Sequence, residues 1–160
     1  MNLNNLFEKI ENTSNDIPIV LVDKSGSTQS LMSTGKSIMI TFADIISKHI
    51  KSKYRLMFWC DKYEIIDDIV YLDETKEIID DIIPAGMTDM SMAFEFIPVE
   101  WLSACHNIYI LTDGDINEDK YNFALQIKTL TELNPNIKLH IISLEANNHD
   151  YQNKEYYAGI

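Results

Sequence analysis

Short, continuous apolar runs alternate along this chain with stretches in which apolar residues recur at helical spacing. The first run, residues 17–22, reads IPIVLV and stops at Asp23. Continuous runs of this kind are typical of strands that are buried on both faces, as in parallel sheets. Strands that alternate with helices indicate right-handed crossovers. We therefore expect an α/β protein with a doubly wound, mostly parallel sheet and helices on both faces.

The expected elements follow one another without an internal repeat or a linker. Strands are expected at residues 17–22, 54–60, 64–72, 105–111 and 137–144. Helices are expected at residues 31–50, 75–83, 89–96 and 118–133. A length of 160 residues corresponds to one domain. We expect this domain to span residues 16–145, with an arm or short helix at 1–15 and a polar, irregular tail at 146–160.

The charge balance excludes several classes of partner. Thirteen basic residues stand against 25 acidic ones, which gives a net charge of −12. A negative field of this size repels nucleic-acid phosphates and anionic lipid headgroups, so neither nucleic acid nor a membrane is an expected partner. The sign favours binding of a cation or a basic partner.

Cysteine usage and the length of the apolar runs bear on the compartment. Cys60 and Cys105 are too few for a disulfide framework or a four-thiolate zinc site, and both lie in apolar runs, so buried free thiols are expected. The first residues do not have the pattern of a signal peptide. No apolar run approaches the length of about 18 residues that a membrane span needs. A cytoplasmic location is therefore expected.

Oxygen-bearing side chains follow two of the expected strands. Asp23, Ser25 and Ser27 come after the first strand, and Asp113 follows the fourth. The loop that contains Thr88 precedes a helix and can fold over the same edge of the sheet. Because ligands of open α/β sheets bind beyond the carboxyl ends of the strands, these side chains are expected to meet there.

This set of oxygens has the chemistry of a site for a hard cation. Carboxylate and hydroxyl oxygens suit Mg²⁺, with Mn²⁺ or Ca²⁺ as alternatives. Alternate positions of an extended loop point the same way, so Asp23, Ser25 and Ser27 can converge on one ion. Gly26 is expected to relieve the backbone at that turn. Only two carboxylates would face the ion, which leaves it able to attract an external carboxylate.

The three segments together resemble the von Willebrand factor A family and its metal-ion-dependent adhesion site. That family has Asp-x-Ser-x-Ser after its first strand, a Thr in a Gly-containing loop and an Asp in a Thr-Asp-Gly loop. This chain has DKSGS at 23–27, GMTD at 86–89 and TDG at 112–114. The intervals from Ser27 to Thr88 and from Thr88 to Asp113 are 61 and 25 positions, which fit the family's layout.

The resemblance covers residues 16–145 and implies a Rossmann-like fold of the intracellular type. Metal contact is implied for five residues, directly or through water for the two aspartates: Asp23, Ser25, Ser27, Thr88 and Asp113. The Asp or Glu of a partner then completes the octahedron. The implied function is Mg²⁺-dependent binding of a protein partner within an intracellular multiprotein assembly, without catalysis.

This chain departs from the family pattern in three places. Met87 stands where a Gly usually precedes the loop Thr, and Thr28 stands where a hydrophobic residue often follows the second Ser. The family's last helix and last strand have no clear counterpart, so the C-terminal strand and helix are expected to be missing or degenerate. The strand at 137–144 would then be an exposed edge. We expect the tail to fold back over it, with Tyr151, Tyr156 and Tyr157 packing on the last helix or strand.

Two other functions remain open from the sequence. A metal-dependent phosphatase or phosphoacceptor could use Asp23, but Ser25 occupies the position at which haloacid-dehalogenase-like enzymes need a second Asp. A metal-free assembly module would keep the fold without the site. No residue pair looks like a nucleophile with its base, so an enzyme is not expected.

Overall fold

A mixed sheet with helices on either side forms the framework of this chain. The computed structural model describes residues 16–30, 36–51, 53–61, 63–113, 120–144 and 154–158. Six strands of these residues form one sheet in the order β3-β2-β1-β4-β5-β6. They are β1 (Ile19–Asp23), β2 (Tyr54–Trp59), β3 (Tyr63–Val70), β4 (Asn107–Thr112), β5 (Lys138–Ser143) and β6 (Lys154–Ala158). The four central strands run parallel, and β3 and β6 pair antiparallel at the two edges.

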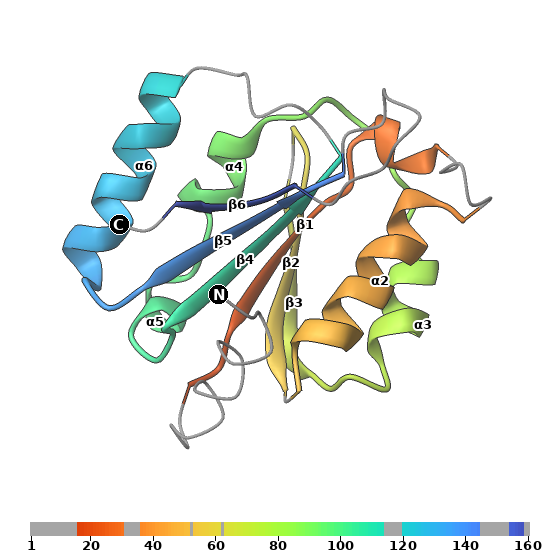
Figure 1. Ribbon diagram of the computed structural model, residues 1–160, viewed down its shortest axis with the longest axis horizontal. Coiled ribbons are helices and arrows are strands. Elements are labelled where there is room, and N and C mark those ends of the chain that lie inside the picture. The colour runs from red at the N-terminus through yellow and green to blue at the C-terminus, as the bar shows by residue number, and fades with distance from the viewer. Residues whose placement is uncertain are drawn as a thin grey trace.

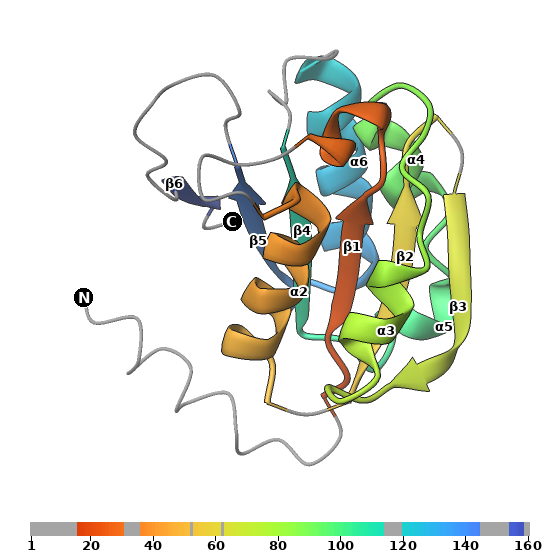
Figure 2. The same ribbon diagram turned by 90° about the vertical axis from the view of Figure 1, so that its right-hand side faces the viewer.

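Helices cover both faces of the sheet (Figures 1 and 2). On one face lie α2 (Ile38–His49) and α3 (Thr75–Asp80). On the other face lie α4 (Met90–Glu95), α5 (Val99–Leu102) and α6 (Lys120–Leu133). A 3-10 helix, η2 (Gly26–Gln29), follows β1 at its carboxyl end, where a loop was expected. The doubly wound α/β fold predicted from the alternating runs is confirmed.

Polar caps set the starts of two helices in this arrangement. The Ser37 hydroxyl accepts the backbone N–H of Ile40 at 3.1 Å, so α2 begins at residue 38. The Asp89 carboxylate accepts the backbone N–H of Ser91 at 3.0 Å and caps α4. Of the helix expected at 31–50, residues 31–35 lie outside the described residues. The short helix α5 was not expected.

Alternate residues of the central strands supply two separate cores. In β1, Ile19 and Leu21 belong to the cluster beneath α4, α5 and α6. Val20 and Val22 belong to the cluster beneath α2 and α3. All four are fully buried, because successive side chains of a strand point to opposite faces and helices cover both. This is the burial that the continuous apolar run predicts.

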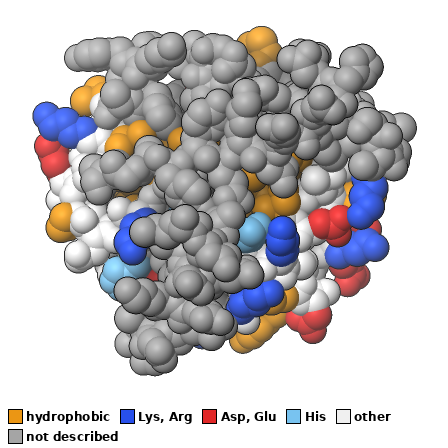
Figure 3. Space-filling view, viewed as in Figure 1, with side chains coloured by type: hydrophobic (Ala, Val, Ile, Leu, Met, Phe, Trp, Pro, Cys, Tyr) orange, Lys and Arg blue, Asp and Glu red, His pale blue; other side chains and the backbone are white. Residues whose placement is uncertain are grey.

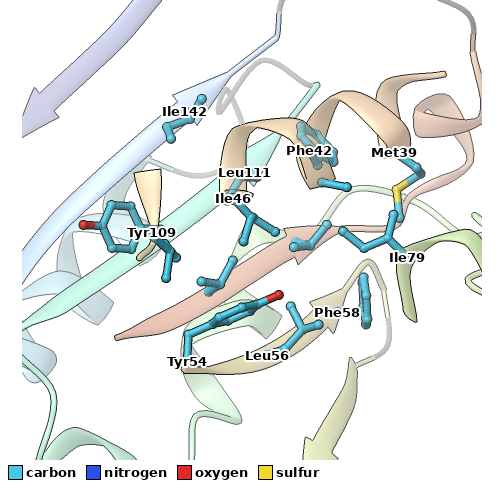
Figure 4. Packing of buried hydrophobic residues seen from close by; sticks show 14 of the residues in the cluster. Met39, Phe42, Ile46, Tyr54, Leu56, Phe58, Ile79, Tyr109, Leu111 and Ile142 are labelled. Carbon is cyan, nitrogen blue, oxygen red and sulfur yellow. The ribbon is translucent and has the colours of Figure 1, made fainter. Parts of the chain in front are cut away.

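The cluster on the α2 face shows how the helix is held on the sheet. In Figure 4, Phe42 and Ile46 extend from α2 towards Leu111 of β4, and Met39 lies near Ile79 of α3. Phe42 and Ile46 are one helical turn apart, which places them on the same face of α2. This packing anchors α2, which is separated from η2 by eight residues.

The two cysteines are buried free thiols, as expected. Burial raises the pKa of Cys105 to about 12, so its thiol stays protonated and unreactive at neutral pH.

Among the helices that the structure describes, none combines the length and the apolarity that a membrane crossing requires.

The C-terminal strand, expected to be missing or degenerate, is present as a short strand. Residues 154–158 form β6, which pairs antiparallel with β5 from Leu139 opposite Ala158 to Ser143 opposite Lys154. The tail therefore covers the β5 edge through its backbone, because the free N–H and C=O groups of an edge strand pair with an extended segment that reaches them. The packing expected of Tyr151, Tyr156 and Tyr157, the arm at 1–15 and any helix at 145–153 lie outside the described features.

Candidate metal site

Two aspartates lie at the carboxyl ends of neighbouring strands, where the strand order reverses. From β1 the chain moves outward to β2 and β3, and from β4 it moves the other way, to β5 and β6. Asp23 is the last residue of β1, and Asp113 directly follows β4. The two strands are neighbours, with Val22 opposite Leu111. Open α/β sheets bind ligands at such a switch point, so this rim is the place to look for a site.

Asp23 is fully buried, and both of its carboxylate oxygens accept hydrogen bonds. Oδ1 accepts the backbone N–H of Ser25 at 2.8 Å, and Oδ2 accepts the hydroxyl of Thr112 at 2.7 Å. The first bond turns the chain directly after β1, and the second ties the end of β1 to the end of β4. Thr112 was not expected to take part, although it lies in the Thr-Asp-Gly segment that placed Asp113 at the rim.

A row of hydroxyl groups connects the β1 loop to Asp113. Ser25 Oγ and Ser27 Oγ share a hydrogen bond at 3.1 Å, and Ser27 Oγ donates to Asp113 Oδ1 at 3.1 Å. Ser25 is buried and Ser27 is exposed, so the row runs from the interior to the surface. Four of the five residues predicted as metal ligands are thus brought into one hydrogen-bonded cluster: Asp23, Ser25, Ser27 and Asp113.

Asp113 is the member of this cluster whose ionised form is disfavoured by its environment. Its second oxygen, Oδ2, is buried and has no hydrogen-bond partner. Burial and, after it, the negative charge of Asp23 raise the pKa of Asp113 to about 6, against the opposing effect of the Ser27 hydrogen bond. A buried carboxylate oxygen without a donor, beside a second carboxylate, is stabilised when a cation or a proton compensates it.

The loop between α3 and α4 brings Thr88 to the same rim. The backbone N–H of Ala85 donates to the Lys24 carbonyl at 2.8 Å, and the N–H of Gly26 donates to the Gly86 carbonyl at 3.0 Å. These bonds hold the loop against the segment that follows β1, and Figure 2 shows the loop passing beside η2. Within the described part of the chain, no hydrogen bond joins Thr88 to the other four predicted ligands.

Gly86, rather than Gly26, is the glycine that this rim requires. Gly86 has a φ of 86°, in the left-handed region that favours glycine. A Cβ at this position would collide with the carboxylate of Asp61 and would lie 3.2 Å from Cys60 Sγ. At Gly26, an added Cβ would meet only the Gly86 carbonyl oxygen, at an ordinary 3.6 Å. The expected role of Gly26 in relieving the backbone is therefore wrong.

Thr28 takes a structural role in the turn where the family resemblance suggests a hydrophobic residue. It is fully buried, and its hydroxyl donates to the carbonyl of Ser25 at 2.8 Å. The same carbonyl accepts the backbone N–H of Thr28 at 3.1 Å. Both bonds hold Ser25 in place, so this departure preserves the turn that carries the serines.

A cation at this rim would depend on hydroxyl oxygens as well as on carboxylates. In the described stretches, no group of three or more His, Cys, Asp or Glu is placed to hold a metal ion. The rim itself offers two carboxylates and two serine hydroxyls, with Thr88 on the adjacent loop. Neutral and anionic oxygens of this kind fit Mg²⁺, Mn²⁺ or Ca²⁺ rather than a metal that prefers thiolate or imidazole.

Comparisons with known proteins identify structures with a similar fold. Neither a family model nor a curated protein matches this sequence. An aerotolerance-related membrane protein from Bacteroides fragilis, solved with multiple mutations to serine, matches with a TM-score of 0.59 and 13% identity over 89% of this chain and 81% of that chain. The conserved hypothetical protein BatB from Bacteroides thetaiotaomicron matches with a TM-score of 0.60 and 16% identity, over 89% of this chain and 80% of that one. At these identities the likeness concerns the fold alone, and by that measure this chain is similar to both proteins in its α/β architecture.

Proposed function

We propose that this chain is a protein-binding module of the von Willebrand factor A type, in which Mg²⁺ at the rim receives a carboxylate of a protein partner. One observation carries the proposal: Asp113 lies beside Asp23 and the two serine hydroxyls, with its Oδ2 buried and without a donor. A divalent cation would compensate that oxygen and offset the repulsion between the two carboxylates.

The residues of the rim would contact the ion in different ways. Ser25, Ser27 and Asp113 would contact it, and Thr88 would reach it from the adjacent loop. Asp23, whose oxygens already accept two hydrogen bonds, would act through its charge or through water. When bound, Mg²⁺ supplies positive charge and coordination positions that the protein does not fill. Because Mg²⁺ usually keeps several waters, an external carboxylate can replace one of them.

The surroundings of Asp23 favour binding over phosphate chemistry. A phosphoacceptor must present a carboxylate oxygen to the phosphorus atom. Asp23 is fully buried, and its two oxygens accept bonds from Ser25 and Thr112. We therefore propose a module without catalysis of its own.

We place this module in a reducing compartment and keep the cytoplasm as its proposed location. The support is the state of the cysteines, since Cys60 and Cys105 are both buried and free. Free thiols persist where glutathione and thioredoxin keep them reduced. Alkylation of the protein from its native source, unfolded in denaturant before and after reduction, would check this proposal, and a thiol that becomes reactive only after reduction would contradict it.

Thermal unfolding in Mg²⁺ and in EDTA tests the metal. At 100 times its dissociation constant, Mg²⁺ should stabilise the fold by about 2.7 kcal/mol. Asp113→Asn should abolish this gain, whereas Asp73→Asn, which removes one exposed negative charge distant in sequence from the rim residues, should keep it. Titration calorimetry provides a second readout. If the wild type shows neither a shift nor heat, the metal is excluded and the metal-free assembly module is favoured.

A further inference from the structure

The loop between α3 and α4 carries two large apolar side chains into solvent beside the proposed metal. Ile83 is 79% exposed and Met87 is 74% exposed, the two highest values among the exposed large hydrophobic residues of the described chain. Single exposed apolar residues are ordinary. These two lie four positions apart on a loop whose backbone is hydrogen-bonded to the segment after β1, so both are available for contact with a partner near the rim. We call Ile83 and Met87 together the apolar lip.

The backbone holds the apolar lip in place. Ala85 and Gly86 lie between its two members and are hydrogen-bonded to Lys24 and Gly26. Gly86 is also held in a left-handed conformation, in which its Cα faces the Asp61 carboxylate. Met87 directly follows Gly86, whose carbonyl accepts the Gly26 N–H. Since consecutive Cα atoms are about 3.8 Å apart, the Met87 Cα lies next to this bonded residue. The backbone between Ile83 and Met87 is therefore fixed to the rim by the same hydrogen bonds that hold the loop against the segment after β1.

Charge around the apolar lip restricts what can bind to it. The two residues before Ile82, Asp80 and Asp81, are exposed, and the chain as a whole carries a net charge of −12. A partner segment with several acidic residues would be repelled by this surface. A segment with one acidic residue can place that carboxylate on the metal and must gain the rest of its affinity from uncharged contacts. The lip offers apolar contacts of this kind.

We propose that the segment bound at this rim carries a single Asp or Glu with a large apolar residue one or two positions away, which packs on the apolar lip. This inference rests on the proposed function, because the carboxylate is the group that Mg²⁺ would receive. The metal selects the acidic residue, and Ile83 and Met87 select its neighbour. Only a minority of interface side chains lower affinity by more than about fivefold when they are truncated, and these are the well-packed anchors that a bound apolar residue would meet.

A random dodecapeptide library displayed on phage provides the probe. It is panned on the full chain in Mg²⁺, and bound phage are released with EDTA. The released sequences should be enriched in one acidic residue with Leu, Ile, Met, Phe or Trp nearby. For a synthetic peptide of this type, Met87→Ser and Ile83→Ser should each weaken binding about five- to tenfold, with Mg²⁺ binding by calorimetry unchanged.

Val99→Ser is the matched control. Val99 is 65% exposed on α5, at the opposite end of the sheet from η2 (Figure 1), so this variant should bind the peptide like the wild type. The inference is overturned if the peptides released by EDTA show no apolar preference, or if both lip variants bind the synthetic peptide as tightly as the wild type. It is also overturned if panning on the Mg²⁺-loaded protein recovers no peptide that EDTA releases. In those cases Mg²⁺ binding by calorimetry still stands. Absence of Mg²⁺ binding itself overturns the proposed function, and the inference with it.

Discussion

The buried, donor-free carboxylate of Asp113 suits a cation, but without a cation its ionisation lowers the stability of the folded protein. Its pKa of about 6 in the folded chain exceeds the ordinary value of 3.8, so the folded state binds more protons than the unfolded state between about pH 4 and pH 6. The free energy of unfolding of the metal-free protein should therefore fall as pH rises through that window. Asp113→Asn cannot ionise and keeps an oxygen for the Ser27 hydroxyl. In EDTA at pH 7 it should be more stable than the wild type by roughly 1–2 kcal/mol.

Urea unfolding at pH 4 and pH 7 measures this difference. The advantage of Asp113→Asn should be present at pH 7 and should largely disappear at pH 4, because pH 4 lies close to the ordinary pKa of 3.8 and well below the folded-state pKa of about 6. An advantage that is the same at both pH values would contradict the assignment of the raised pKa to Asp113. Gain of stability on removal of a charged group is common at functional sites, where binding requires an unfavourable arrangement in the free protein.

Two neighbouring glycines at the rim should respond differently to substitution. Gly86→Ala puts a side chain at a left-handed φ of 86° and requires the exposed Asp61 side chain to move aside, and we expect a loss of about 1–2 kcal/mol. Gly26→Ala meets only an ordinary contact with the Gly86 carbonyl oxygen and should cost less than about 1 kcal/mol. Chemical unfolding of both variants in EDTA compares them. Equal losses would show that the loop accommodates a side chain at Gly86.

At the scale of elements, β6 makes β5 an interior strand. The backbone of residues 154–158 pairs with β5 from Leu139 to Ser143. A chain ending at Asn148 would lose these partners and leave β5 bonded to β4 on one side only. The β5 amides that face β6 should then exchange their hydrogens at least about tenfold faster, because they lose protection that only paired backbone groups have. Hydrogen exchange followed by mass spectrometry or NMR measures this change.

The β4 amides are the internal control for this experiment, since β4 lies between β1 and β5 in both chains. Their exchange should change less than that of β5. Equal protection of β5 in the two chains, with both monomeric, would show that β6 contributes no pairing in solution.

At the scale of the whole molecule, the excess of acidic residues opposes the compact state. The net charge is −12, although basic and acidic side chains are interspersed among the described residues on the face shown in Figure 3. Self-repulsion of this size weakens as salt shortens the Debye length from about 30 Å at 0.01 M to about 3 Å at 1 M. In EDTA, the Tm should therefore rise by a few degrees between 0.02 and 0.5 M KCl. A falling Tm would indicate that ion pairs such as Lys36–Asp44 outweigh the repulsion.

The architecture and most of the rim follow from the pattern of residues along the chain. The alternation of apolar runs with helical patterns was sufficient for a doubly wound sheet, because burial on both faces requires apolar residues at every position of a central strand. Asp23, Ser25 and Ser27 lie within five positions of one another, so local spacing placed them together. Asp113 is 90 positions away from Asp23, but the rule that parallel strands end at one edge brought it to the same site.

The contacts within this rim become visible only once the chain is folded. The hydrogen bond from Thr112 to Asp23, the collision that reserves residue 86 for glycine, and the donor-free oxygen of Asp113 each depend on segments that are distant in sequence. The pairing of β6 with β5 likewise depends on an edge that exists only in the assembled sheet. Periodicity and spacing record which residues are buried and which lie near one another along the chain. They contain no distances between atoms of separate segments, and those distances determine hydrogen bonding, steric exclusion and pKa.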